Sequence, residues 1–266
     1  MNLESTLRAR RDSGHKLLVA YVTGGLPVGG GETWIEVVRA VAAAGADAVE
    51  VGIPFSDPVM DGPVIQEASR LALEAGTTPR GLLAELAGAG GGAGGMGVPL
   101  AVMTYFNVVH AFGLDRFAQS LSRSGVDGAI IPDLPLDEAG PWMAEAVGHR
   151  VETVMLAAPT TPDERLVAIC AASSGFVYGV GLMGVTGVRD SLAASALALA
   201  KRLKAVTDKP VLIGVGVSDA AQAVEACSEA DGVVIGSALM RRLLEGAGSS
   251  GVAELIAEVR AALEAG

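Results

Sequence analysis

Eight short apolar runs, each followed by a longer helical stretch, constrain the fold of this chain more than any other feature of its sequence. The runs are rich in Val, Ile and Leu, and a turn signal separates each run from the alanine-rich segment after it. This alternation is typical of parallel strands joined by crossover helices. The apolar runs begin near Leu17, Ala48, Pro99, Gly128, Val151, Phe176, Pro210 and Gly232. The helical stretches follow at about residues 33–44, 64–75, 114–124, 136–147, 162–173, 192–206, 219–227 and 252–263.

Eight strands with eight helices predict an α/β fold, a closed (β/α)8 TIM barrel, preceded by an extra amphipathic helix at about residues 3–11. Such barrels use roughly 250 residues as one domain, so we expect residues 1–266 to form a single catalytic domain. An open doubly wound sheet gives a similar alternation, but usually with fewer units, and no early strand is followed by a GxGxxG helix opening. Residues 88–97 are mostly Gly and Ala, and we expect a flexible surface connector there.

Charge and composition exclude several classes of partner. The formal net charge of -11 opposes attraction to nucleic acid phosphates and to anionic membrane surfaces. No run approaches the roughly 20 apolar residues of a membrane span, and the charged N-terminus lacks a secretory core, so we expect a soluble cytoplasmic protein. Cys170 and Cys227 are interpreted as small buried hydrophobic residues. His15, His110 and His149 show no metal-ligand spacing, and no metal is expected.

Glu50 is a carboxylate inside an apolar strand, the run at residues 48–53. Burying a carboxylate is costly without a partner or a function, so its side chain must face the barrel interior or reach solvent at the rim. From position alone, a salt bridge or a solvated strand end explains Glu50 equally well. Because the reactive groups of a TIM barrel lie at the carboxyl ends of its strands, Glu50 is also a candidate catalytic residue.

The loop after Glu50, at residues 54–63, contains three prolines, two aspartates and a glycine. Such a stiff loop holds side chains in place at a low entropic cost. Asp57 and Asp61 also have a plainer interpretation as turn residues, because aspartate commonly accepts backbone hydrogen bonds in loops.

Glycines follow the sixth, seventh and eighth predicted strands. Barrels often bind phosphate through the loops after strands seven and eight and through a short helix N-terminus. The seventh strand ends in GVGVS at residues 214–218, and the eighth ends in Gly236 and Ser237 ahead of a helical segment. After the sixth strand, residues 181–187 form a candidate lid that offers Gly187 to the same phosphate. Each loop alone is an ordinary connection, but their convergence favours a phosphate site.

The segment EVGIPFSDPVMDGPVIQ, residues 50–66, closely resembles the signature of tryptophan synthase alpha subunits. The likeness extends over nearly the whole chain, with the motifs in the same order. They are YVT at residues 21–23, PDLP at 132–135, APTT at 158–161, GVTG at 184–187 and GVGVS at 214–218. In one departure, Gly181 and Leu182 stand where many members have Ser-Arg ahead of the lid motif, so we expect lid closure to be held differently.

The resemblance implies roles for individual residues. Glu50 would be the general acid-base residue, and Asp61 would hold the indole nitrogen. Tyr178 would lie beside the substrate, and Thr186 would help to order the lid near Asp61. The phosphate group would be bound by Gly187, Gly216, Gly236 and Ser237.

The resemblance also implies a reaction and a partner. The reaction is the cleavage of indole-3-glycerol phosphate to indole and glyceraldehyde 3-phosphate in tryptophan biosynthesis, a carbon-carbon lyase step with no cofactor in this chain. A beta subunit that uses pyridoxal phosphate would receive the indole within an alpha2beta2 heterotetramer. Pro54 and Asp57, with Asn107, resemble the surfaces that members present to that subunit.

The cleavage is a retro-aldol reaction, and it requires protonation of the indole ring at C3 before the carbon bond breaks. An apolar setting such as Val49, Val51 and Ile53 would raise the pKa of Glu50 and keep it protonated for this step. An ionised Asp61 would stabilise the positive charge that develops toward the ring nitrogen. Two alternatives remain open: a stand-alone indole-3-glycerol phosphate lyase, and a non-catalytic barrel that activates a partner.

Overall fold

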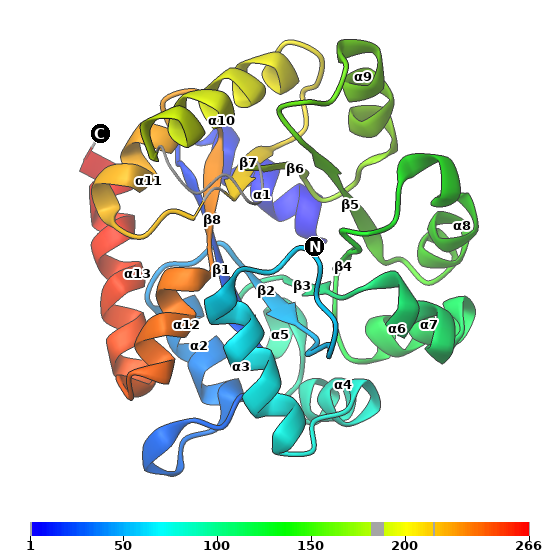
Figure 1. Ribbon diagram of the computed structural model, residues 1–266, viewed down its shortest axis with the longest axis vertical. Helices are drawn as coiled ribbons and strands as arrows, with labels where there is room; N and C mark the ends of the chain where they lie inside the picture. The colour runs from blue at the N-terminus through cyan, green and yellow to red at the C-terminus, as the bar shows by residue number, and fades with distance from the viewer. Residues whose placement is uncertain (1, 182–188, 215, 266) are drawn as a thin grey trace.

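Eight parallel strands close into a barrel in their order along the chain, from β1 to β8, as the prediction required. The computed structural model describes residues 2–181, 189–214 and 216–265. Helices surround the barrel on its outside (Figure 1). The strands are β1 Leu17–Thr23, β2 Ala48–Gly52, β3 Leu100–Met103, β4 Gly128–Ile130, β5 Glu152–Ala157, β6 Val177–Val180, β7 Val211–Gly214 and β8 Gly232–Ile235. Each begins within one residue of its predicted start.

The helices follow the strands and account for every helical stretch expected from the sequence. They are α1 Leu3–Asp12, α2 Trp34–Ala43, α3 Pro63–Glu74, α4 Pro79–Gly88, α5 Gly92–Gly95, α6 Phe106–Phe112, α7 Leu114–Arg123, α8 Gly140–Gly148, α9 Asp163–Ala172, α10 Arg189–Lys204, α11 Ala220–Ala226, α12 Ser237–Leu244 and α13 Gly248–Ala265. Short 3-10 helices lie at Gly29–Gly31 and Leu136–Glu138. Helix α6, directly after β3, was not expected. Among the described residues, no helix is long and apolar enough to cross a membrane.

Side chains alternate between two cores along each strand, because successive residues of a strand point to opposite faces. On β1, Leu17 and Val19 belong to the core inside the barrel, whereas Leu18 and Ala20 belong to the core between the barrel and its helices. The inner core also contains Ala48, Ala101, Ile130, Val154, Phe176, Leu212 and Val234. This inner core fills the barrel toward the amino ends of the strands. The carboxyl ends of the strands therefore remain open for a site.

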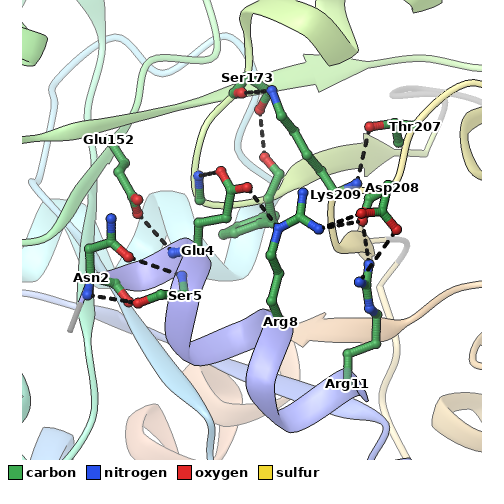
Figure 2. Close-up of polar contacts among 12 residues, drawn as sticks. Asn2, Glu4, Ser5, Arg8, Arg11, Glu152, Ser173, Thr207, Asp208 and Lys209 are labelled. Carbon is green, nitrogen blue, oxygen red and sulfur yellow. Dashed lines mark hydrogen bonds and ion pairs between the residues drawn. The ribbon is translucent and has the colours of Figure 1, made fainter.

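Helix α1 closes the lower end of the barrel. Leu3 and Leu7 are fully buried in the inner core. The backbone N–H of Glu4 donates to a carboxylate oxygen of Glu152 at 2.9 Å, and Arg8 binds Asp208 at 2.7 Å (Figure 2). The extra N-terminal helix therefore acts as the floor of the barrel.

The glycine-rich segment at residues 88–97 corrects one expectation, because it is packed and not a free connector. It contains the single-turn helix α5, and Gly91 and Gly92 are buried. At Gly91, φ is +38°, and an added Cβ atom would lie 1.9 Å from the backbone oxygen of Ser124. The absence of side chains, which suggested flexibility, instead allows two backbone segments to approach closely.

Candidate functional site

A cavity of about 260 Å³ opens at the carboxyl ends of the strands. Six of the residues singled out from the sequence line it: Glu50, Asp61, Tyr178, Gly216, Gly236 and Ser237. The other lining residues are Tyr21, Met60, Gly62, Ile65, Met103, Pro132, Leu156, Val180, Gly181, Gly214 and Val234. Thr186 and Gly187, expected on the lid, lie outside the described residues, as does Leu182. The cavity is thus mostly apolar, and two carboxyl groups and several glycines line it.

Glu50 points into the barrel from the middle of β2, where it pairs with Tyr21 of β1 and Ala101 of β3. Its residue exposure is 1%, and its Oε2 atom has no hydrogen-bond partner among the described residues. Burial raises the pKa of Glu50 to about 8, and the nearby Asp61 carboxylate raises it further. This carboxyl group is not solvated at the rim, no ion pair within the described ranges includes it, and its raised pKa favours the protonated form at neutral pH.

The apolar environment of Glu50 does not come from the residues expected to provide it. Val49, Val51 and Ile53 all belong to the outer core, because they alternate with Glu50 along the strand. Groups that face the cavity, such as Tyr21 and Met103, enclose the carboxyl group instead. The direction of the pKa shift was therefore predicted correctly, but its cause was assigned to the wrong side of the sheet.

Asp61 reaches the cavity from the loop between β2 and α3. Its backbone carbonyl accepts a hydrogen bond from the Gln66 side-chain amide at 2.8 Å. The backbone N–H of Met60 donates to the Tyr105 hydroxyl at 3.0 Å. Partial burial raises the pKa of Asp61, whereas the neighbouring Tyr105 hydroxyl acts in the opposite direction.

Two tyrosines fill the barrel mouth above the inner core, each placed over a glycine of the next strand. An added Cβ atom at Gly52 would lie 2.0 Å from the Tyr21 hydroxyl oxygen, and one at Gly214 would lie 2.5 Å from that of Tyr178. Burial raises the pKa of both phenols above the ordinary value, so both stay neutral. Tyr178 was expected beside the substrate, but Tyr21 was noted only as part of a motif. Its odd-numbered register with Leu17 and Val19 was the signal that it faces inward.

Backbone groups line the cavity where β7 and β8 end. Gly214 ends β7, and Gly216 adopts φ of +73° with open space where a side chain would stand. Helix α12 begins at Ser237 with Gly236 as its N-cap, and no side chain caps the first N–H groups. Uncapped N–H groups at a helix N-terminus and glycine backbone are suited to an anion.

The residues expected at a partner surface lie outside the cavity. Asp57 and Asn107 are exposed, whereas Pro54 is buried. Val59, on the same loop as Asp57, exposes 73% of its surface. Asp57 accepts a hydrogen bond from the Ser56 hydroxyl at 2.5 Å.

Among the described residues, one cluster of possible metal ligands lies on the outer helices, away from the cavity. Donor atoms of Asp115, Glu145 and His149 lie within 4.8 Å of one another. Asp115 and His149 already pair at 2.8 Å, joining the start of α7 to the end of α8. This contact links the two helices, so it gives Asp115 and His149 a structural explanation.

The sequence matches the family model described as "Tryptophan synthase alpha chain" over residues 7–264. A protein of that description from Streptomyces coelicolor is 45% identical over 262 residues, with 97% of this chain and 94% of that protein covered. One from Thermobifida fusca is 42% identical over 268 residues, covering 99% of this chain and 97% of the relative.

Solved structures give the same result for the fold. A structure of Mycobacterium tuberculosis tryptophan synthase matches with a TM-score of 0.88 at 38% identity, covering 99% of this chain and 98% of that chain. The tryptophan synthase subunit alpha of Legionella pneumophila matches with a TM-score of 0.86 at 28% identity, covering 100% of this chain and 99% of that chain.

Proposed function

Because this chain belongs to the tryptophan synthase alpha chain family, we propose that Glu50 and Asp61 carry out the chemistry of its reaction. The chain is a lyase of tryptophan biosynthesis that cleaves indole-3-glycerol phosphate, and its family needs no cofactor for this step. The observation that carries the proposal is the enclosed Glu50 carboxyl group, whose pKa burial raises, in the same cavity as Asp61.

Glu50 acts first as the general acid. Its proton is transferred to C3 of the indole ring, which turns the ring into an electron sink. The Glu50 carboxylate then accepts the proton of the hydroxyl group next to the scissile bond, the carbon-carbon bond breaks, and an aldehyde and indole result. A pKa of about 8 keeps the acid form populated at neutral pH and leaves a carboxylate basic enough for the second transfer.

Asp61 supplies the electrostatic part of the mechanism. Protonation of C3 makes the ring nitrogen more positive, and the Asp61 carboxylate accepts its N–H. Because this charge exists only as the reaction proceeds, the interaction stabilises the transition state more than the ground state. Tyr178 and Tyr21 lie against the indole ring in this scheme, since both line the cavity.

The phosphate binds at the glycine loops in this proposal. Gly236 and Ser237 provide backbone N–H groups at the start of α12, Gly216 provides one from the loop after β7, and Gly187 is the further phosphate residue that the family resemblance implies. A site of dipoles without a lysine or arginine among the described lining residues suits a phosphate that must be released after each turnover.

The alpha chain implies a beta partner. We propose a cytoplasmic alpha2beta2 heterotetramer in which the beta subunit uses pyridoxal phosphate to consume the indole. Asp57 and Asn107, with the exposed loop around Val59, would meet that subunit, and the buried Pro54 would stiffen the loop from below.

The test is indole release from indole-3-glycerol phosphate by the purified chain, alone and with the beta subunit. We expect weak activity that the partner stimulates, and loss of turnover in Glu50→Gln. Asp61→Asn should lower kcat by roughly 10²- to 10³-fold, because it removes an electrostatic interaction that stabilises the transition state. Folded variants with turnover near that of the native chain would refute the assigned roles. High activity without the partner would favour a stand-alone lyase, and none in either condition would favour a non-catalytic barrel.

A further inference from the structure

Tyr21 lies in one row across three neighbouring strands, between the proposed acid and the proposed phosphate site. Strand β1 pairs with β2 on one side, where Tyr21 is opposite Glu50. On the other side β1 pairs with β8, and Ala20 is opposite Ile235 (Figure 1). The residues that follow these two, Tyr21 and Gly236, therefore stand side by side. An added Cβ atom at Gly236 would lie 3.2 Å from the Cβ atom of Tyr21, which agrees with this placement.

The ring of Tyr21 extends from this row toward the end of β2. Its hydroxyl oxygen lies over Gly52, where an added Cβ atom would clash with it. Gly52 follows Glu50 by two residues, so both face the inside of the barrel. The phenol therefore crosses the barrel mouth from Gly236, the N-cap of α12, to the strand that carries Glu50.

The Tyr21 hydroxyl has a proton that no hydrogen bond among the described residues uses. It accepts a long hydrogen bond from the Thr23 hydroxyl at 3.4 Å. Tyr21 lines the cavity, although only 6% of the residue is exposed. Burial raises the pKa of this phenol, so it stays neutral and can donate to a ligand. The proposed function uses the ring of Tyr21 and leaves its hydroxyl without a role.

The cavity offers few polar side chains to a substrate that carries two hydroxyl groups on its glycerol chain. Among the described lining residues, the side chains that form ordinary hydrogen bonds are those of Tyr21, Glu50, Asp61, Tyr178 and Ser237. In the proposed function, Glu50 acts at the hydroxyl next to the scissile bond, Asp61 at the ring nitrogen and Ser237 at the phosphate. The hydroxyl on the middle carbon of the glycerol chain is left for one of the two phenols.

Position decides between these two phenols. The glycerol chain joins the carbon at which Glu50 acts to the phosphate at Gly236, so its middle carbon lies between the two sites. Tyr21 stands at that place in the row. Tyr178 lies on β6 instead, and its hydroxyl lies over Gly214 at the end of β7.

We propose that Tyr21 is a substrate-binding residue: its hydroxyl donates to the hydroxyl group on the middle carbon of the glycerol chain and makes the site selective for a hydroxylated chain. The inference rests on the proposed function, because the positions of the scissile bond and of the phosphate come from it. Cleavage leaves the middle hydroxyl unchanged, so this bond contributes to binding and specificity and transfers no proton.

The test compares two ligands in the Glu50→Gln background, which is expected not to turn them over. The ligands are indole-3-glycerol phosphate and its deoxy analogue, in which the middle carbon of the chain carries no hydroxyl group, and calorimetry measures their Kd values. Tyr21→Phe removes the hydroxyl and keeps the ring. We expect it to weaken the binding of indole-3-glycerol phosphate roughly 3- to 10-fold, the effect of one neutral hydrogen bond, and to leave the Kd of the deoxy analogue unchanged. An equal change for both ligands, or no change for either, would overturn the inference.

Tyr178→Phe in the same background is the matched control, because it removes the other phenol hydroxyl of the cavity. We expect it to change the two Kd values by the same factor, so that the preference for the hydroxylated ligand remains. If Tyr178→Phe reduced this preference as much as Tyr21→Phe does, recognition would not depend on the place of Tyr21 in the row, and the inference would fail.

These measurements separate the inference from the proposed function. Turnover by Glu50→Gln would refute the acid role of Glu50, and the KM values of the same variants would then measure the effect of Tyr21. Absence of binding of both ligands would refute both proposals. Circular dichroism checks folding, and if Tyr21→Phe is unfolded, Gly52→Ala takes its place, because its methyl group must displace the phenol hydroxyl. An intact preference for the hydroxylated ligand in Gly52→Ala would refute the inference.

Discussion

A fully enclosed carboxyl group keeps its proton at pH values where an exposed one has lost it, and Glu50 is enclosed in this way. Its strand register places it inside the barrel, whereas its chain neighbours Val49 and Val51 face the outer helices. One residue of register therefore separates a core position from a reactive one. The same alternation of side chains along β1 and β6 places Tyr21 and Tyr178 at the barrel mouth.

Glu50→Gln is expected to change the pH dependence of stability as well as turnover. The folded pKa of about 8 exceeds the ordinary value of 4.5, so the folded state binds more protons between these values, and stability falls as pH rises through that window. Glutamine does not ionise. The free energy of unfolding of the variant, relative to the native chain, should therefore rise between pH 5 and pH 8.5 by a few kcal/mol, on the order of 4.

Urea unfolding at pH 5, 7 and 8.5 measures this difference. A constant difference across the three pH values would mean that Glu50 ionises at its ordinary pKa in the folded protein, and the general-acid proposal would lose its basis.

At the scale of elements, two helices have tasks beyond covering the sheet. Helix α1 closes the lower end of the barrel with Leu3 and Leu7, and its polar contacts reach Glu152 and Asp208 (Figure 2). Helix α12 presents an uncapped N-terminus to the cavity. Apolar contacts hold α1 in place, and the N–H groups without a side-chain cap make the start of α12 suited to an anion.

Leu3→Ala should destabilise the protein far more than Asp208→Ala. Leu3 is fully buried against Gly128 and Gly175, and truncation of such a leucine costs about 2–5 kcal/mol. Asp208 exposes 88% of its side chain, and solvent screens its ion pair with Arg8. Thermal and urea unfolding of both variants checks the ranking, and equal losses would show that ion pairs rather than packing hold α1.

Ser237→Asp should raise KM for indole-3-glycerol phosphate at least 10-fold, because a carboxylate would stand where the phosphate meets the start of α12. Ser228→Asp adds the same charge at an exposed position beyond α11, before β8. Steady-state kinetics of the two variants separates local from general charge effects. A KM that rises equally in both would contradict a phosphate site at α12.

The strands and the two carboxylates could be predicted from the sequence because both signals are local. The apolar runs mark strand positions to within one residue, and the segment around Glu50 and Asp61 is contiguous. The packing of Gly91 against Ser124 could not be predicted, since it joins segments that are far apart in the sequence. Tyr105 was missed for the same reason: its contact with Met60 exists only after the barrel brings β2 and β3 together.

At the scale of the whole molecule, the closed barrel supports the prediction that residues 1–266 act as one domain, with the reactive cavity at one end. The loop with Asp57 and Val59 also carries the cavity residues Met60 and Asp61, and Asp57, Val59 and Asn107 are exposed. A partner docked on these segments would lie over the loop that carries Asp61.

Asp57→Ala should weaken the complex with the beta subunit. Removing an exposed charge from the contact surface should raise, several-fold, the beta-subunit concentration that gives half-maximal stimulation of indole release. Glu225→Ala, on α11, removes an equal charge from an exposed position and serves as the control. If both variants need the same concentration of beta subunit as the native chain, Asp57 is not part of the contact.

Helix α1 and the inner core close one end of the barrel, so the cavity is closed at that end and does not run through the barrel. Substrate enters and indole leaves through the opening at the carboxyl ends of the strands. The group that covers this opening decides whether indole is released into water or transferred to a partner protein. Because the inner core and α1 close the other end of the barrel, the rim at the carboxyl ends of the strands is where the route of indole is decided.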